Sequence, residues 1–225
     1  MSSHHIVRDD QEPALIIANG EACSMDLLNQ LLEWSPHIVV LDSAVERVLE
    51  LGIKIDVLIG DFDRDFDRDF DHKKYENMQY PPIKVIKVDD QNSTDLDKAY
   101  QYLIDHNFPA ANVVWATGRR TDHTFSNLTN MVQVKNKLRV VLLDDYSKVF
   151  LCPAIFKKWY PGGTPISLIP IGTVSGITTK NLVYSLHDES LTLGYRSGSS
   201  NEVATDGMVE ISYREGDLLL MECFD

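Results

Sequence analysis

Short runs of apolar residues alternate with helix-like patterns over the first two thirds of the chain. The apolar runs that we expect to form strands are residues 14–18, 37–41, 57–59, 83–88, 113–117 and 140–143. Between them, apolar residues recur every three or four positions, which predicts helices. These helical segments are residues 27–32, 45–49, 96–104 and 125–132. Strands that are apolar throughout and alternate with helices indicate a parallel sheet covered on both faces.

The pattern changes near residue 150. After Pro161, Gly162 and Gly163 the apolar runs become short and are separated by Gly, Asn, Asp and Ser. These runs are residues 166–169, 176–179, 182–186, 209–213 and 218–222. Runs of this kind predict a small antiparallel β domain. We therefore expect two domains, an α/β domain over residues 1–150 and a β domain over residues 151–225.

Composition and charge narrow the classes of function. The chain has 225 residues, of which 44% are hydrophobic, enough for one large or two modest domains. Its net charge of −13 argues against a nucleic-acid partner, because phosphate backbones need cationic surfaces. The same charge suits a cationic substrate or metal ions.

Two further features concern location and redox chemistry. No apolar run approaches the roughly 20 residues of a membrane helix, so no membrane partner is expected. The polar start of the chain lacks the order of a secretory signal, and we expect a cytoplasmic protein. The three cysteines are far apart and form no C-x-x-C pair, so neither a disulfide framework nor a zinc site is expected.

Carboxylates recur where the predicted parallel strands end. In chain order they are Asp42, Asp61, Asp63, Asp89, Asp90, Asp95, Asp122, Asp144 and Asp145. Ligands of open α/β sheets bind at the carboxyl ends of the strands. Carboxylates that meet there repel one another unless a cation lies among them. The sequence therefore favours a cation site at this edge of the sheet.

Asp61 and Asp63 are the leading candidates for metal ligands. Side chains two residues apart in an extended segment point to the same side, and such a pair suits Mg²⁺ together with substrate phosphates. An acidic turn that only caps the next segment would contain the same residues. The tetrad Asp-Phe-Asp-Arg is repeated from Asp65 and again, ending in histidine, from Asp69. We assign the metal to the first copy because only it follows Gly60, and interpret the later copies as a solvated loop.

A predicted helix begins at Ser93-Thr94-Asp95. Thr94 can cap this helix, and Asp95 suits its positive end. Asp95 can also supply a third metal ligand, and Lys98, one turn further on, can contact a phosphate. Capping alone would explain the first two residues, because Ser-Thr-Asp is a common helix start.

Arg120, Asp122 and His123 precede another predicted helix. Arginine suits phosphate oxygens and the charge that builds up during phosphoryl transfer. Asp122 can be a simple helix cap, and an isolated histidine such as His123 is more often a packed residue than a catalytic base.

The chain lacks the common nucleotide-binding motifs, namely G-x-x-x-x-G-K-[ST], G-x-G-x-x-G and the H-R-D and D-F-G pair of protein kinases. Its own motifs, in their order and spacing, resemble those of the thiamine pyrophosphokinase family. The matching segments are residues 58–63 (LIGDFD), 90–99 (DQNSTDLDKA), 118–127 (GRRTDHTFSN), 166–170 (ISLIP), 182–186 (LVYSL) and 200–201 (SN). The resemblance spans nearly the whole chain.

This resemblance implies a Rossmann-like, parallel-sheet N-terminal domain over residues 1–150 that binds ATP and Mg²⁺. It also implies a small antiparallel β-sandwich domain over residues 151–225 that binds thiamine and forms a homodimer. The implied enzyme is a thiamine diphosphokinase, which transfers diphosphate from ATP to the hydroxyethyl oxygen of thiamine and releases AMP.

The resemblance also implies roles for individual residues. Mg²⁺ would be held by Asp61, Asp63 and Asp95, with Asp42 nearby. The residues implied to line the ATP and thiamine sites are Gln91, Thr94, Lys98, Arg120, Asp122, His123 and Asn127, with Ser200 and Asn201 contacting thiamine across the dimer. Arg120 would stabilise the developing charge, and either Asp122 or Asp95 would accept the proton of the alcohol.

The chain departs from the family pattern at several positions. The family has Asp-Gly-Gly where this chain has Asp42-Ser43-Ala44, and serine where it has Arg64. It also favours glycine at Arg119 and Asn181, and some members have a tryptophan where Glu202-Val203 stand here. The changes in the β domain motivate an alternative acceptor, another primary alcohol such as a hydroxymethylpterin. The lost glycines motivate a second alternative, a nucleotide- or thiamine-binding protein without catalysis.

Overall fold

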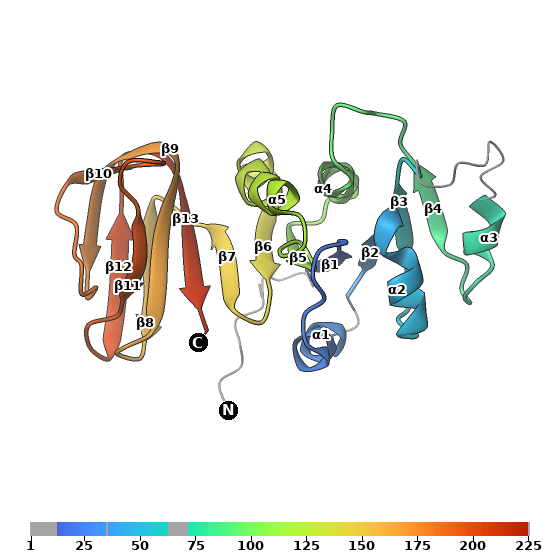
Figure 1. Ribbon diagram of the computed structural model, residues 1–225, viewed down its shortest axis with the longest axis horizontal. Helices are drawn as coiled ribbons and strands as arrows, with labels where there is room; N and C mark the ends of the chain where they lie inside the picture. The colour runs from blue at the N-terminus through green and yellow to red at the C-terminus, as the bar shows by residue number, and fades with distance from the viewer. Residues whose placement is uncertain (1–12, 35, 63–71, 225) are drawn as a thin grey trace. The chain divides into compact units, whose positions relative to one another are not determined.

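The computed structural model describes residues 13–34, 36–62 and 72–224. Asp63 and the repeated tetrads from Asp65 to Asp71 lie outside these residues. The chain divides into two units, Met1–Asp144 and Asp145–Asp225, each of which is shown in Figure 1.

The apolar runs of the first unit form a parallel sheet. Its strands are β1 Ala14–Ile17, β2 Ile38–Leu41, β3 Val57–Gly60, β4 Lys84–Lys87, β5 Ala110–Val114 and β6 Arg139–Leu143. They lie in the order β4-β3-β2-β1-β5-β6, and every neighbouring pair is parallel. Every residue of β1, β2, β3 and β5 is buried, as expected for a sheet covered on both faces.

Helices cover both faces of this sheet, with α1 and α2 on one face and α4 and α5 on the other (Figure 1). Their bounds are α1 Met25–Leu32, α2 Val45–Glu50, α3 His72–Glu76, α4 Asp95–Asp105 and α5 Thr121–Val134. Among the helices that the structure describes, none is long and apolar enough to cross a membrane.

The order of the strands in the sheet reverses between β1 and β5. Strands β2, β3 and β4 extend the sheet from one side of β1, and β5 and β6 extend it from the other side. Strands β1 and β5 are parallel neighbours, but the helices that come after them, α1 and α5, lie on opposite faces of the sheet. The chain therefore leaves β1 and β5 toward opposite faces of the sheet, and this topology predicts a crevice at the carboxyl ends of the strands. Open α/β sheets bind their ligands in such a crevice.

The second unit is built from antiparallel strands. They are β7 Ser147–Leu151, β8 Ile155–Tyr160, β9 Pro165–Lys180, β10 Glu189–Thr192, β11 Gly198–Glu202, β12 Gly207–Ser212 and β13 Glu215–Cys223. Their order is β7-β13-β9-β12-β8, and β10 and β11 also pair with β9. The buried core residues include Ile166, Leu168, Val209, Ile211, Leu218 and Leu220.

Strand β9 differs from the sequence prediction. The sequence predicts two strands at residues 166–169 and 176–179, whereas one strand runs from Pro165 to Lys180. Gly172 and Gly176 lie within it at φ values of 73° and 69°, in the left-handed region. Glycine adopts this conformation without steric cost, so the strand bends and continues to new partners instead of ending. The predicted strand at residues 182–186 is absent, and Leu182 forms only an isolated bridge with Val203.

A buried charged cluster lies in the second unit around Glu222. Its carboxylate accepts hydrogen bonds of 2.6 Å from Lys158 Nζ and 2.6 Å from Tyr160 Oη. Burial alone would raise the pKa of Glu222, but the hydrogen bonds from Lys158 and Tyr160 outweigh it and lower that pKa. Removing the carboxylate would leave the buried Tyr160 hydroxyl without its acceptor and the partly buried Lys158 without its counterion.

We predict that Glu222→Ala lowers the free energy of unfolding by about 2 kcal/mol, because the buried Tyr160 hydroxyl loses its acceptor and Lys158 loses its counterion. Urea denaturation of the wild type and the variant measures this change. Glu210→Ala is the matched control, since Glu210 pairs with Lys157 and Lys180 at the surface and its loss should change stability little. Equal effects of the two variants would contradict the prediction.

Candidate active site

Three carboxylates meet at the carboxyl ends of the parallel strands. Asp42 comes after β2 and begins the 3-10 helix Asp42–Ala44, Asp61 comes after β3, and Asp95 begins α4. Each offers one oxygen, and these three oxygens lie within 4.8 Å of one another. Asp42, expected near the metal, therefore belongs to the cluster itself. The predicted third ligand Asp63 lies outside the described residues.

The position of Asp42 depends on a close approach to Gly60. A Cβ atom at Gly60 would collide with the Asp42 carboxyl group, so only glycine leaves room for this side chain. The backbone N–H of Phe62 then donates a hydrogen bond of 2.8 Å to Asp42 Oδ2. Burial, with the negative charge of Asp95 as the second cause, raises the pKa of Asp42 to about 6.

Among the residues that the structure describes, Lys98 forms ion pairs with two carboxylates of this cluster. The residue is buried, and its Nζ lies 3.0 Å from Asp95 Oδ1 and 3.4 Å from Asp61 Oδ2. Burial would lower the pKa of Lys98, but the hydrogen bond and the charge of Asp95, with those of Asp61, raise it. One ammonium group among three carboxylates leaves negative charge to be balanced.

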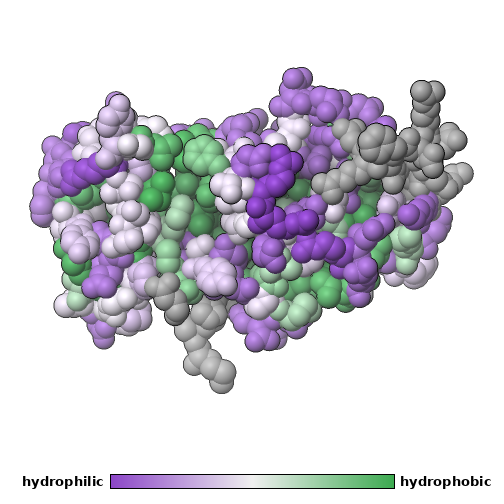
Figure 2. All heavy atoms as spheres, viewed as in Figure 1, coloured by the Kyte–Doolittle hydropathy of each residue, from purple (hydrophilic) through white to green (hydrophobic). Residues whose placement is uncertain are grey.

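A cavity of about 380 Å³ opens above the cluster. Among the predicted site residues, those that line it are Asp42, Asp61, Thr94, Asp95, Arg120, His123 and Asn127. Figure 2 shows hydrophilic side chains gathered over α5 and the end of β1, in the same part of the first unit. The size is typical of a small-molecule site.

The two interpretations of the α4 start are both compatible with the geometry. Thr94 accepts a hydrogen bond from the backbone N–H of Asp97, and Asp97 in turn accepts from the backbone N–H of Thr94. This capping box fixes the first turn of α4. Because the first turn is fixed, Asp95 is held with its carboxylate toward Asp42 and Asp61. Thr94 therefore caps the helix, while the neighbouring Asp95 remains the candidate metal ligand.

Three predicted site residues that the structure describes in the first unit do not line the cavity, namely Gln91, Lys98 and Asp122. The carboxylate of Asp122 accepts hydrogen bonds of 3.1 Å and 2.5 Å from the Arg120 guanidinium group. This hydrogen bonding lowers the pKa of Asp122 to about 2. An exposed carboxylate with that pKa is a weak base near neutral pH, and the pair instead orients Arg120.

Other predicted residues have clear structural partners. Asn127 Nδ2 donates a hydrogen bond of 2.7 Å to the carbonyl of Ala116, which ties α5 to the segment after β5. Ser200 and Asn201 lie in the second unit, on β11. The buried amide of Asn201 accepts from the backbone N–H of Tyr184 and donates to its carbonyl. Its oxygen also accepts from the N–H of Glu202.

Residues directly after β1 belong to the site, although no motif of the sequence singles them out. Asn19 and Gly20 line the cavity together with Arg119. A Cβ atom at Gly20 would collide with the carbonyl oxygens of Trp115 and Thr117, so the segments after β1 and β5 touch there. The signal that could have identified the Asn19-Gly20 pair is its place at the carboxyl end of a buried parallel strand.

Arg119 and Asn181, where the family pattern favours glycine, both have a left-handed backbone conformation. Arg119 has φ 52° and Asn181 has φ 62°. Asparagine adopts this conformation at little cost, whereas arginine does so with strain of about 1 kcal/mol or more. The preference for glycine at both positions thus has a backbone cause.

Comparison with known proteins identifies two family models along the chain. Residues 28–142 match the model described as thiamin pyrophosphokinase, catalytic domain. Residues 156–218 match the model described as thiamin pyrophosphokinase, vitamin B1 binding domain. The first match contains the whole three-carboxylate cluster.

Individual relatives agree with these matches. The chain is 25% identical over 216 residues to thiamin pyrophosphokinase 1 of Caenorhabditis elegans, covering 89% of this chain and 85% of that protein. The yeast thiamin pyrophosphokinase structure matches with a TM-score of 0.80 at 17% identity, covering 97% of this chain and 88% of that one. The Bacillus subtilis thiamine pyrophosphokinase structure matches with a TM-score of 0.74 at 21% identity, covering 95% and 99%. These two structures share the fold of this chain.

We predict a pH-dependent stabilisation by divalent cations. Aspartate in the unfolded chain titrates near 3.8 and Asp42 in the folded protein near 6, so the metal-free protein binds the proton more tightly when folded. This contribution to stability is present at low pH and is lost as the pH rises through about 6. A divalent cation replaces the proton, so Mg²⁺ should raise Tm more at about pH 7.5 than at about pH 5.

Differential scanning calorimetry with and without Mg²⁺ measures this shift. Asp42→Asn should reduce the Mg²⁺-dependent rise in Tm, whereas Asp105→Asn, at the exposed end of α4, should leave it unchanged. A shift of the same size at both pH values, or in both variants, would argue against a cation at this cluster.

Proposed function

This chain belongs to the thiamin pyrophosphokinase family and carries both of its domains, and we propose that the three-carboxylate cluster is the centre where diphosphate passes from ATP to thiamine. The activity is that of a thiamin pyrophosphokinase, which yields thiamine diphosphate and AMP. The observation that carries the proposal is the convergence of Asp42, Asp61 and Asp95 around Lys98 at the strand ends.

The donor set fits Mg²⁺. Three carboxylates from separate segments provide hard oxygen ligands within 4.8 Å of one another, and their mutual repulsion favours a divalent cation. Asp42, Asp61 and Asp95 would hold the ion, and Asp63 keeps its predicted place as a further ligand. When bound, Mg²⁺ would neutralise phosphate charge and offset the repulsion among the carboxylates.

The other cavity residues would bind and orient the two substrates. Arg120, held by Asp122, presents its guanidinium group to the phosphates and to the charge that develops during transfer. Thr94, His123 and Asn127 line the same cavity, where they would bind the substrates, and Gln91 keeps its predicted binding role. Holding the alcohol oxygen in line with the phosphorus contributes much of the rate in such reactions.

The proton of the thiamine alcohol needs an acceptor. Of the two predicted acceptors, Asp122 is disfavoured because its pKa is about 2 and it does not line the cavity. We therefore assign the proton to Asp95, whose carboxylate faces the cavity and is hydrogen-bonded to Lys98. Asp122 acts as a positioning residue for Arg120.

The proposal includes a thiamine site formed with the second unit. Ser200 and Asn201 would contact thiamine from a partner subunit, which requires the homodimer and the β-sandwich that the resemblance implies. The Rossmann-like description of the first unit belongs to the same proposal, supported by its parallel strand order and its helices on both faces. A cytoplasmic location stays a prediction.

The decisive experiment measures AMP release from ATP and Mg²⁺, with and without thiamine. We expect thiamine-dependent AMP release by the wild type and at least about a 100-fold loss in Asp61→Asn, which keeps the shape but not the charge. Asp105→Asn serves as the control and should retain full activity. AMP release with a hydroxymethylpterin but not with thiamine would favour the alternative acceptor, and ligand binding without any turnover would favour a binding protein.

A second prediction separates the roles of Asp122 and Asp95. Asp122→Asn should lower kcat by no more than about tenfold and leave the pH profile of kcat unchanged, because the side chain orients Arg120 without exchanging the substrate proton. Asp95→Asn should abolish measurable turnover. Stopped assays across the pH range measure both, and a profile that loses its acidic limb in Asp122→Asn would restore Asp122 as the base.

A further inference from the structure

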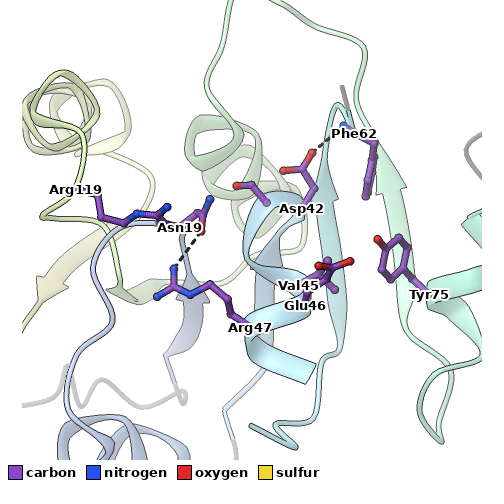
Figure 3. A pocket seen from close by; sticks show the side chains of 9 residues that line it. Asn19, Asp42, Val45, Glu46, Arg47, Phe62, Tyr75 and Arg119 are labelled. Atoms are coloured by element: carbon purple, nitrogen blue, oxygen red, sulfur yellow. Dashed lines mark hydrogen bonds between the residues drawn. The ribbon is translucent and has the colours of Figure 1, made fainter. Parts of the chain in front are cut away.

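A second cavity of about 400 Å³ adjoins the first in the same unit. The two cavities share Asn19, Asp42, Ser43 and Arg119. Figure 3 shows Arg47 and Arg119 with Asn19 on one side of the second cavity and the rings of Phe62 and Tyr75 on the other. The cavity thus has a cationic side and an aromatic side, with the carboxylates of Asp42 and Glu46 between them.

The two guanidinium groups converge on the side chain of Asn19. Its Oδ1 accepts hydrogen bonds from Arg47 Nη1 at 3.1 Å and from Arg119 Nη1 at 3.3 Å. Arg47 is further fixed by the carbonyl of Gly20 at 3.0 Å and by its position 4.4 Å over the Trp115 ring. All these bonds use one Nη group of each arginine, so the remaining donors of both are available to a ligand.

Within residues 13–34, 36–62 and 72–224, no carboxylate forms an ion pair with Arg47 or Arg119. Two like charges that share one acceptor, here Asn19 Oδ1, repel each other. An anionic ligand between the two guanidinium groups would remove the repulsion.

The backbone of Arg119 supports the same conclusion. The residue lies at φ 52°, where glycine is unstrained and an arginine is not. Retaining a charged side chain at a position that glycine would occupy at lower cost points to a task for that side chain.

The position of the cavity identifies the anion. Asp42 lines both cavities, so a phosphate beside the two arginines is next to the phosphates at the carboxylate cluster. Thiamine is a cation and is repelled by the guanidinium pair. The remaining substrate is the nucleotide, whose aromatic base suits the side with Phe62 and Tyr75.

We infer that this second cavity receives the nucleoside monophosphate part of ATP, with Arg119 and Arg47 binding the α-phosphate. The inference rests on the proposed function. In the reaction, the thiamine oxygen bonds to the β-phosphorus and the bond from that phosphorus to the α–β bridging oxygen breaks. The electron pair stays on this oxygen, which leaves with AMP, and the arginines stabilise the charge that develops there.

Isothermal titration of AMP and steady-state kinetics test this assignment on Arg119, because Arg47 also supports the Trp115 ring. Arg119→Gly and Arg119→Ala should each weaken AMP binding and raise KM for ATP about tenfold or more, with KM for thiamine unchanged. Arg119→Lys, which keeps the charge but not the planar group, should fall between wild type and alanine. Asn107→Gly is the matched control, since it replaces another left-handed residue, at φ 59°, outside both cavities.

The outcomes separate this inference from the proposed function. If the wild type shows thiamine-dependent AMP release and the Arg119 variants keep its AMP affinity and its KM for ATP, the second-cavity assignment is wrong and the function stands. If AMP binding depends on Arg119 but thiamine causes no turnover, the assignment stands and the function is wrong. A weakened AMP affinity in Asn107→Gly equal to that in Arg119→Gly would also overturn the assignment, because the effect would then come from the backbone.

Discussion

The repulsion among three carboxylates is the constraint on which the active site depends. Their oxygens lie within 4.8 Å of one another, and one buried ammonium group cannot balance them. Such an arrangement is maintained because two of the carboxylates, Asp42 and Asp95, are fixed from outside the cluster. Gly60 leaves room for Asp42, the N–H of Phe62 holds its oxygen, and the capping box of α4 holds Asp95. Burial is the main cause of the raised pKa of Asp42, and repulsion by Asp95 is the second cause.

The parallel sheet makes it possible to hold these carboxylates together. Its central strands are buried along their whole length, so the segments after them are anchored at one end by the core. The carboxylates come from segments after different strands, and the sheet order brings those segments to one edge. Because the helices after β1 and β5 lie on opposite faces, the crevice lies beside Asn19 and Arg119. The stability of the core thus maintains a site that is unfavourable by itself.

Local sequence is enough to predict much of the fold and part of the site. The parallel strands and their helices are predictable from apolar runs and helical spacing, because both signals arise within a few residues. The full length of strand β9 is not predictable in this way. Gly172 and Gly176 are typical of strand ends in the sequence, whereas in the structure they bend a continuous strand through left-handed conformations. Asp42 is predictable at a strand end, but its place in the cluster depends on the space left by Gly60, a contact between segments that no local pattern encodes. The same is true of Arg47, whose helical position gives no sign that it lines a cavity.

The two cavities also divide charge in a way that matches the two substrates of the proposed reaction. The three clustered carboxylates line the first cavity, and the guanidinium groups of Arg47 and Arg119, without ion pairs among the described residues, stand on one side of the second, which Glu46 also lines. A cationic acceptor is attracted to the first and repelled by the second, whereas a nucleotide can enter both only when a cation balances the carboxylates. Asp42 lies where the two cavities meet, since it lines both of them. Electrostatics therefore requires the metal to bind before or together with the nucleotide, whereas it sets no such condition on the cationic acceptor.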